Sequence, residues 1–501
     1  MFDAVVIGSG PNGLVGAITL ARQGWSVLVL EAKDRPGGAL YSVENTRPGF
    51  VHDVGAAFFP FAKASPAFRE LQLDEVGLRF VAGKYESAHP APDGTCASIS
   101  RDIALSRASF GEDGDAWAKF HDWANAMGDR LPEALLAPLV DVRTAFRLGV
   151  KNIIGMGLAA MGSASGYARW NFRTEAARRV IPALSLHVDL GPADFTGGAL
   201  GLVLGLLAAK DGFLIPVGGA KAITDALLKR FSQAGGKVQY ESHVDEIVVR
   251  DKRAVAVRTS NGDEIPFRHA VLADVGPPSL FFRLLDEKLA PYWLRKSIGR
   301  FRYGWGTFKM DWALSGPVPW TSPEACEAAV VHTGDSLQDL QHFTQEVRSG
   351  QLPSNPYLVI GQQSLLDSTR APEGQHTLWA YSRVPNTMPG GWEGHKELLA
   401  DRIDQRIEQL APGFRERILA RAIHAPADLE AMDENLVDGD LGGGSAQIDQ
   451  QLFLRPTFPY FRYRTHVRGV YLASASAHPG AGVHGACGRN AAMMALADAK
   501  K

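Results

Sequence analysis

The sequence of 501 residues has few cysteines, little net charge and no long apolar run. Its three cysteines, Cys96, Cys326 and Cys487, are far apart and form neither a CxxC pair nor a zinc-ligand spacing. The formal net charge of −2 gives no electrostatic basis for binding nucleic acid. No apolar run reaches the roughly 18 residues that span a bilayer. We therefore expect no metal site, no nucleic-acid partner and no membrane-spanning helix, and the scarce cysteine suits a reducing, cytoplasmic location.

The first 38 residues have the strand–turn–helix–strand pattern of a nucleotide-binding unit. We expect a strand at 2–7, a glycine-rich turn at 8–13, a helix at 14–22 and a second strand at 26–30. The second strand ends at Glu31, a position from which a carboxylate can accept hydrogen bonds from a ribose diol. Because an acid there repels a 2′-phosphate, we expect an unphosphorylated adenosine dinucleotide.

Each residue of the turn suits a phosphate site. Gly8 permits the tight turn, Gly10 lets backbone N–H groups approach a pyrophosphate, and Gly13 allows helix and strand to pack closely. Pro11 and Asn12 lie in the turn just before the predicted helix, whose N-terminal N–H groups favour an anion. The turn is therefore predicted to bind the pyrophosphate.

A second glycine pair, Gly37 and Gly38, follows Ala32 and Arg35 just past the acidic residue. NAD binding does not require this extension, and a plain type II turn is the alternative interpretation. The stretch resembles the Arg-x-Gly-Gly segment of the flavoprotein amine oxidase and phytoene desaturase superfamily. That resemblance implies that the loop supports the pyrophosphate and ribityl chain of FAD. The superfamily usually has arginine where this chain has Ala39, so Arg35 or Lys33 is the candidate for a charge near the phosphates.

The middle of the chain resembles the second FAD-binding segment of the same superfamily. A helix pattern at 220–233 is followed by strand patterns at 237–249 and 254–259. The resemblance implies that the backbone of Val244 contacts adenine, although an ordinary strand residue is the alternative. We expect an α/β fold whose parts are a discontinuous Rossmann-like FAD-binding domain (1–60, 211–278 and 436–501), a helical cap (61–210) and a mixed-sheet substrate domain (279–435).

The end of the chain has the pattern of a strand, a glycine-rich loop and a final helix. Small residues let such a loop lie against a flat ring, and a helix N-terminus stabilises negative charge that develops nearby. The ending resembles the HPG-G segment of carotenoid desaturases and retinol saturases, and more closely the pyridine nucleotide-disulfide oxidoreductase domain-containing type 2 group. The resemblance implies flavin contacts at Gly480, Gly482, Val483 and His484.

Three side chains are candidates for proton chemistry. His478 and His484 flank the flavin loop, although each suits a structural, hydrogen-bonded histidine equally well. Lys309 lies on a strand that resembles the one presenting a lysine near flavin N5 in amine oxidases. Because Asp311 points to the same face of that strand, a Lys309–Asp311 salt bridge is the alternative. We expect Cys487 to be a small buried residue.

The resemblance implies an FAD-dependent oxidoreductase that desaturates, saturates or isomerises C–C and C=C bonds. The predicted substrate is an apolar small molecule, such as an isoprenoid or polyene. The apolar run at 199–209 is either a buried core helix or part of a substrate channel. An amine oxidase and an FAD-bound interaction protein with little turnover are the alternatives.

Electrons must also leave the protein. The chain has neither a second GxGxxG after a strand nor a CxxC, so we expect no separate nicotinamide domain. Oxygen or a quinone is then the predicted electron acceptor. A peripheral contact with a membrane surface would suit an apolar substrate, and the composition does not indicate the oligomeric state.

Overall fold

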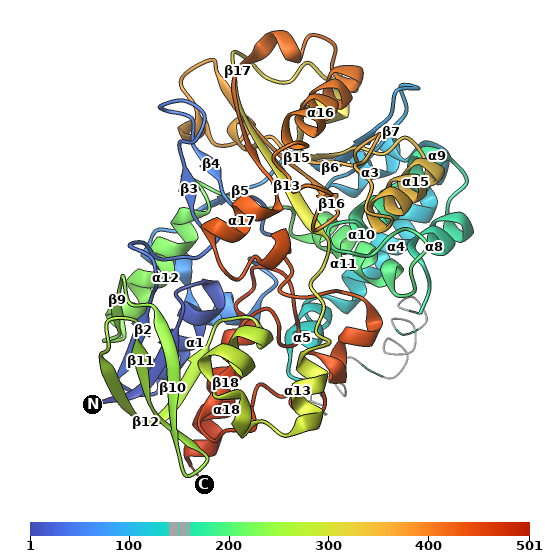
Figure 1. Cartoon of the computed structure of the whole chain (residues 1–501). Helices are drawn as coiled ribbons and strands as arrows, with labels where there is room; N and C mark the ends of the chain where they lie inside the picture. The colour runs from blue at the N-terminus through green and yellow to red at the C-terminus, as the bar shows by residue number, and fades with distance from the viewer. Residues whose placement is uncertain (140–148, 150–156, 158–160, 501) are drawn as a thin grey trace.

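The computed structural model describes residues 1–139, 149, 157 and 161–500. It contains two large β-sheets, one at each end of the molecule, with helices packed around them (Figure 1). The expected α/β class is therefore confirmed.

The first sheet combines strands from the beginning, the middle and near the end of the chain. Its strands, in spatial order, are β10 (Val244–Arg250), β11 (Arg253–Thr259), β12 (Glu264–Ala273), β1 (Phe2–Ile7), β2 (Val27–Leu30) and β9 (Lys237–Gln239), with β18 (Val470–Leu472) paired to β12. The pairs that join β18, β12, β1, β2 and β9 are parallel. Three segments far apart in sequence therefore form one Rossmann-like sheet.

Three helices pack beside this sheet, namely α1 (Pro11–Ala21), α12 (Lys221–Gln233) and α18 (Ala486–Ala499). Helix α1 contacts both α12 and α18. It begins at Pro11 rather than at 14, because proline suits the first helical turn, where its missing N–H has no partner to lose.

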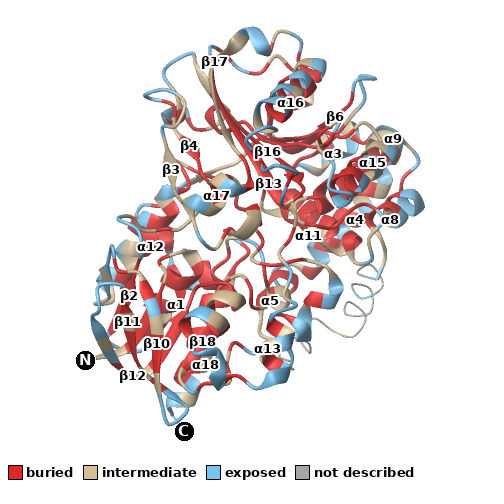
Figure 2. Cartoon of the chain, viewed as in Figure 1, coloured by how far each residue is buried: buried red, intermediate tan, exposed pale blue. Residues whose placement is uncertain are grey.

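The second sheet is mixed and mostly buried (Figure 2). Its order is β17 (Ile418–His424), β13 (Gly306–Leu314), β16 (His376–Val384), β15 (Val359–Gly361), β14 (Ala328–His332), β6 (Tyr85–Pro90) and β7 (Cys96–Ile99). Side chains of β16 alternate between two cores: Leu378 packs with the amphipathic helix α16 (Lys396–Leu410), whereas Trp379 and Tyr381 pack on the opposite side. Both faces of the sheet are thereby covered.

The opposite face is covered by helices of the region predicted as a helical cap. These are α3 (Ile103–Ser109), α4 (Gly114–Met127), α5 (Arg130–Leu136), α8 (Ala164–Asn171), α9 (Glu175–Arg178), α10 (Val180–Ser185) and α11 (Gly197–Lys210). Among the described residues, no helix combines the length and apolarity needed to cross a bilayer. Part of the predicted cap, within 140–160, lies outside the described residues.

Residues 61–210, predicted as a helical cap and substrate region, also contain strands β6 and β7. They belong to the second sheet, where β6 pairs with β14 and β7. Both faces of β6 are buried, so its sequence lacks the alternation that marks a half-exposed strand. The three-part division of the chain remains a prediction.

Shorter elements connect these layers. They are β3 (Ser42–Val43), β4 (His52–Asp53), α2 (Pro66–Leu71), β5 (Phe80–Val81), β8 (Ile215–Pro216), α13 (Tyr292–Ile298), α14 (Pro323–Cys326), α15 (Leu337–Arg348) and α17 (Pro426–Met432).

Candidate functional site

Two adjoining cavities run from the first sheet toward the second. The first, of about 110 Å³, lies at the carboxyl ends of β1, β2 and β12. The second, of about 340 Å³, extends toward β14, β15 and β16. Their walls share Gly10, Gly38, Asp274, Asp433 and Asn435, so the two cavities form one elongated site. Ligands of open α/β sheets bind at this edge.

The glycine-rich turn forms part of the wall. Gly8 and Gly10 line the first cavity, and Pro11 and Asn12 line the second. Gly13 lies behind the wall, and a Cβ placed on it would be 2.3 Å from the carbonyl oxygen of Gly8. Glycine at position 13 is therefore required by the close approach of α1 to the turn, as its predicted packing role implies.

Glu31 and Val244 both line the first cavity, beside Ala32. The Glu31 Oε2 atom accepts hydrogen bonds from the N–H and the hydroxyl of Ser9, and Oε1 accepts from the N–H of Lys33 at 2.9 Å. The carboxylate is therefore fixed at the end of β2, where a ribose is predicted to bind.

The second glycine pair folds back onto the first turn. The Gly37 N–H donates to the Ser9 carbonyl at 3.1 Å, which holds Gly38 against the cavity. The Arg35 guanidinium lies 3.3 Å from the centre of the Tyr41 ring and donates to the Gly38 carbonyl at 3.2 Å. Arg35 also lines the first cavity, so its charge is available there.

Asp274 is a site residue that the sequence reasoning missed. It follows the last residue of β12, and its Oδ2 accepts a 2.8 Å hydrogen bond from the Gly13 N–H. Burial, together with the nearby charges of Asp433 and Glu31, raises the pKa of the Asp274 carboxyl to about 7. An acid at the carboxyl end of a strand is the same signal that identified Glu31.

The C-terminal loop reaches the second cavity through Gly482 and Val483. Gly480 lies behind the loop, where a Cβ would meet the buried guanidinium of Arg455 at 3.4 Å. Arg455 also donates to the carbonyls of Gly442 and of other small residues in the wall. The loop is therefore held by a buried cation.

Neither predicted histidine lines a cavity. His484 accepts from the N–H of Ala486 at 3.1 Å and so caps the start of α18, and its ring lies edge-on to Phe61. The Nε2 atom of His478 hydrogen-bonds to the carbonyl of Ala137 at 3.0 Å. Burial lowers the pKa of each histidine to about 4. Both have the structural environment that was the alternative interpretation.

Lys309 also lies away from both cavities. It forms a buried ion pair with Asp311, whose carboxylate accepts from Asn45 at 2.8 Å and lies 3.6 Å from His52. Burial alone would raise the pKa of Asp311, but Lys309 and His52 hold it below its ordinary value. The salt bridge anticipated as the alternative is thus present.

Away from the polar residues that it shares with the first cavity, the second cavity has a mostly apolar wall with a polar region at its far end. Leucine and aromatic side chains form the apolar part, namely Phe58, Phe61, Leu200, Leu204, Phe213 and Trp379. The polar region contains His187, Tyr381 and Arg383. Arg383 donates to the hydroxyl of Thr307 at 2.7 Å and to the His187 carbonyl. No sequence motif surrounds His187, which lies between α10 and α11.

Comparison with known proteins identifies the family. The family described as flavin containing amine oxidoreductase matches residues 12–493. The chain belongs to this family. Its expected membership of a flavin-dependent oxidoreductase superfamily is therefore confirmed.

Curated relatives align with nearly the whole chain. The chain is 28% identical to pyridine nucleotide-disulfide oxidoreductase domain-containing protein 2 of Mus musculus, an alignment that covers 100% of this chain and 94% of the relative. It is also 28% identical to phytoene desaturase (neurosporene-forming) of Rhodobacter capsulatus, with coverage of 96% and 91%. These relatives confirm the expected phytoene desaturase-like branch.

Solved structures share the fold. An oxidoreductase from Methanosarcina mazei superposes with a TM-score of 0.63 at 17% identity and covers 99% of both chains. Putrescine oxidase with bound putrescine superposes with a TM-score of 0.62 at 17% identity, covering 100% of this chain and 99% of the other.

The site of this flavin containing amine oxidoreductase family member fits a flavin cofactor. A Cβ on Gly10 would lie 2.8 Å from the Asp274 carboxylate, so the backbone itself forms the wall where a pyrophosphate would pass. Gly442, Gly443 and Gly482 leave a small-residue surface along the second cavity, suited to a flat ring. When bound there, a flavin supplies hydride exchange.

The titration of Asp274 predicts a pH-dependent cofactor affinity. Below about pH 7 the carboxyl is protonated, which removes a negative charge from the expected pyrophosphate site. Cofactor-free protein should therefore bind FAD more tightly below this pH than above it, by up to about tenfold per pH unit above 7. Fluorescence titration of FAD against pH measures this. Asp274→Asn should flatten the dependence, the exposed Asp225→Asn should leave it unchanged, and equal slopes in all three proteins would refute the assignment.

Proposed function

We propose that the chain is an FAD-dependent oxidoreductase that desaturates, saturates or isomerises C–C and C=C bonds of an apolar, isoprenoid- or polyene-like substrate. The observation that carries this proposal is the apolar cavity of about 340 Å³ that continues from the nucleotide site. Its leucine and aromatic walls bind apolar surface and exclude water. The resemblance to phytoene desaturases supports the same substrate class.

The region formed by His187, Tyr381 and Arg383 disfavours a cationic group at its end of the cavity. Arg383 is buried there and lies 5.1 Å from the Tyr381 ring, so a protonated amine would meet a positive charge. The carboxyl groups of Asp274 and Asp433 line the other end, next to the nucleotide site. The edge-on pair of Trp379 and Tyr381, 5.3 Å apart, favours an amine oxidase. Peroxide release with simple amines would support that alternative. A flavin that neither photoreduces nor reoxidises would support an FAD-bound interaction protein.

A turnover screen with carotenoid, retinoid and fatty enone substrates tests the function. Leu200 and Leu204 on α11 line the cavity, so Leu200→Phe and Leu204→Phe should shorten it. We expect kcat/KM for a long polyene to fall about tenfold or more. A short analogue of the same chemistry serves as the matched control and should change less than twofold. Equal losses for both lengths, or no flavin bleaching with any apolar substrate, would count against the proposal.

Oxygen or a quinone is the proposed electron acceptor, and a peripheral membrane contact would give access to the substrate. Exposed aromatic side chains support such a contact: Trp293 is 47% exposed and Phe458 60% exposed. Lys296 and Arg300 line a hollow together with Trp293, so cations flank the aromatic surface.

Vesicle cosedimentation tests the membrane contact. We expect binding to vesicles of anionic lipid and little binding to zwitterionic ones, because the flanking groups are cationic. Trp293→Ser with Phe458→Ser should abolish it, whereas Trp170→Ser, an exposed tryptophan on α8, should not. Equal binding by all variants would refute the assignment.

A further inference from the structure

Three histidines and a serine form a continuous hydrogen-bonded chain behind the wall of the second cavity. The Nε2 atoms of His187 and His332 are 2.8 Å apart. The Nδ1 atom of His332 lies 2.9 Å from the Ser87 hydroxyl, which lies 2.8 Å from Nε2 of His89. Only His187 lines the cavity, and the other three side chains are buried.

The fold brings these residues together through a parallel strand pair. Ser87 and His89 lie on β6, and His332 ends β14, which pairs with β6 so that Val330 is opposite Ser87. The rings of His89 and His332 stack with centres 4.8 Å apart. Strand β6 of this pair is one of the two strands found in the region predicted as a helical cap.

The far end of the chain is an unpaired polar atom. His89 Nδ1 is buried and has no hydrogen-bond partner among the described residues. Such atoms are rare in native structures and call for an explanation. His89 is itself buried, and the polypeptide becomes exposed only at residues 92–95, three residues further on.

The hydrogen-bonded chain can exist in two polarities, which differ in the direction of every hydrogen bond and have the same net charge. In one, His187 Nε2 donates to His332, His332 Nδ1 donates to Ser87, and Ser87 donates to His89, whose Nδ1 carries a proton. In the other, every bond is reversed, so that His187 Nδ1 carries a proton and His89 Nδ1 does not. The change from the first to the second takes up one proton at His187 Nδ1 and releases one at His89 Nδ1.

We propose that His332, Ser87 and His89 form a proton relay for His187, which accepts the substrate proton at the cavity wall. This inference rests on the proposed function. Desaturation breaks two C–H bonds: one hydrogen leaves with its electron pair as hydride, which the proposed function assigns to the flavin, and the other leaves as a proton. The remaining electron pair forms the C=C bond, His187 Nδ1 takes the proton, and His89 Nδ1 releases one to a water molecule, the partner that this buried nitrogen lacks among the described residues. Saturation runs the same transfers in reverse.

A relay explains how a deeply buried imidazole can act as a base. Burial, with the charge of Arg383, lowers the pKa of His187 to about 3, so an isolated ring there would bind a proton weakly. In the relay His187 never becomes an imidazolium cation, because its Nε2 proton passes to His332 as its Nδ1 gains the substrate proton. His187 is thus the group at the cavity, and the other three are positioning residues.

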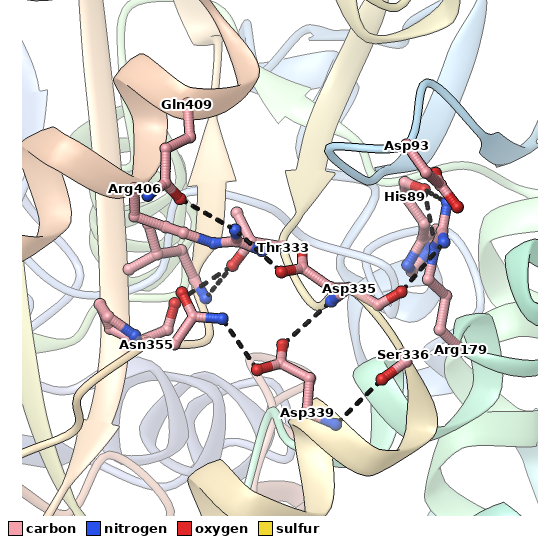
Figure 3. Close-up of polar contacts among 12 residues, drawn as sticks. His89, Asp93, Arg179, Thr333, Asp335, Ser336, Asp339, Asn355, Arg406 and Gln409 are labelled. Carbon is pink, nitrogen blue, oxygen red and sulfur yellow. Dashed lines mark hydrogen bonds and ion pairs between the residues drawn. The ribbon is translucent and has the colours of Figure 1, made fainter.

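Arg179 disfavours a second proton on His89, at the far end of the hydrogen-bonded chain. Its buried guanidinium donates to the His89 carbonyl at 2.8 Å and 3.1 Å and to the carbonyl of Asp335 (Figure 3). Burial and this cation hold the pKa of His89 well below its ordinary value. A proton that reaches His89 is therefore released rather than retained.

Single-turnover flavin reduction tests the relay in the FAD-loaded enzyme. His187→Phe should slow reduction by about 10²- to 10⁴-fold, and Ser87→Ala by about tenfold or more. The matched control is Ser98→Ala, a buried serine on β7 outside the chain. FAD affinity should be unchanged in all three variants. A Ser87→Ala enzyme as fast as Ser98→Ala would overturn the proposal.

Solvent isotope effects separate a relay from a structural role. In the wild-type enzyme several protons move together, so the rate of flavin reduction should vary nonlinearly with the deuterium fraction of the solvent. In Ser87→Ala one proton moves, and the dependence should become linear with a smaller isotope effect. An unchanged curve in Ser87→Ala would overturn the relay, even if the rate had fallen through altered packing.

A spectroscopic readout tests the chain independently of turnover. Histidine ¹⁵N spectra of the cofactor-free protein report which ring nitrogen carries the proton. Because the polarities are coupled, His187→Phe should change the signals of His89, three hydrogen bonds away. Unchanged His89 signals would overturn the relay, whereas coupled signals without any substrate turnover would show that the proposed function has failed and the chain has not.

Discussion

Gly13→Ala should weaken the binding of FAD. The added methyl carbon would lie 2.3 Å from the Gly8 carbonyl oxygen and 3.1 Å from Asp274 Oδ2, so the turn must move away from α1. Overpacking of this kind costs about 1–3 kcal/mol, which corresponds to roughly 10- to 100-fold weaker FAD binding. Calorimetric titration of cofactor-free protein with FAD measures the loss.

Gly394→Ala is the matched control. Its Cβ would meet no atom within 4 Å, and its backbone angle is one that alanine adopts, so FAD affinity should stay within twofold of wild type. If Gly13→Ala bound FAD as well as this control, the glycine-rich turn would not be the pyrophosphate site.

Asp311→Ala should lower stability more than any other single change to a charged residue considered above. Lys309 is 3% exposed, and without Asp311 it would be an unpaired buried cation beside His52. Breaking one partner of a buried pair costs about 3–5 kcal/mol. Thermal and urea unfolding of the FAD-loaded protein measure this. Asp225→Ala, which breaks the exposed Lys221–Asp225 pair, should cost about 1 kcal/mol or less.

A double variant also tests the sequence hypothesis for Lys309. Replacing both charges, as Lys309→Met with Asp311→Leu, should recover most of the stability that Asp311→Ala loses. Because Lys309 lines neither cavity, the double variant should still reduce its flavin with substrate. A stable double variant that cannot do so would show that Lys309 is catalytic, and equal stability of Asp311→Ala and Asp225→Ala would refute the account of the pair.

The sequence predicted the nucleotide half of the site because that half is built from backbone. Glycines at the turn and an acid at a strand end are dictated by close approach and by position at the sheet edge. Gly8, Gly10 and Glu31 therefore lie in the first cavity, as their motif indicates. Asp274 also directly follows a strand at this sheet edge, so the strand pattern before it was the sequence signal that could have identified it.

The substrate half could not be predicted in the same way because long-range strand pairing forms it. His187 and His332 come from segments with no motif. The parallel pairing of β6 with β14 brings His332 beside Ser87 and His89, and the segment between α10 and α11 brings His187 to His332. The histidines near the C-terminal loop are more conspicuous in the sequence; in the structure they hydrogen-bond to backbone groups and line neither cavity. Local patterns indicate what the backbone must do, whereas side-chain clusters depend on the whole fold.

Anaerobic mixing of the FAD-loaded enzyme with substrates tests the central claim most directly. The account predicts that an apolar polyene-like substrate bleaches the flavin, that amines do not, and that Leu204→Phe slows bleaching by the long substrate but not by its short analogue. Bleaching by amines together with none by any apolar substrate would contradict the assignment of the second cavity.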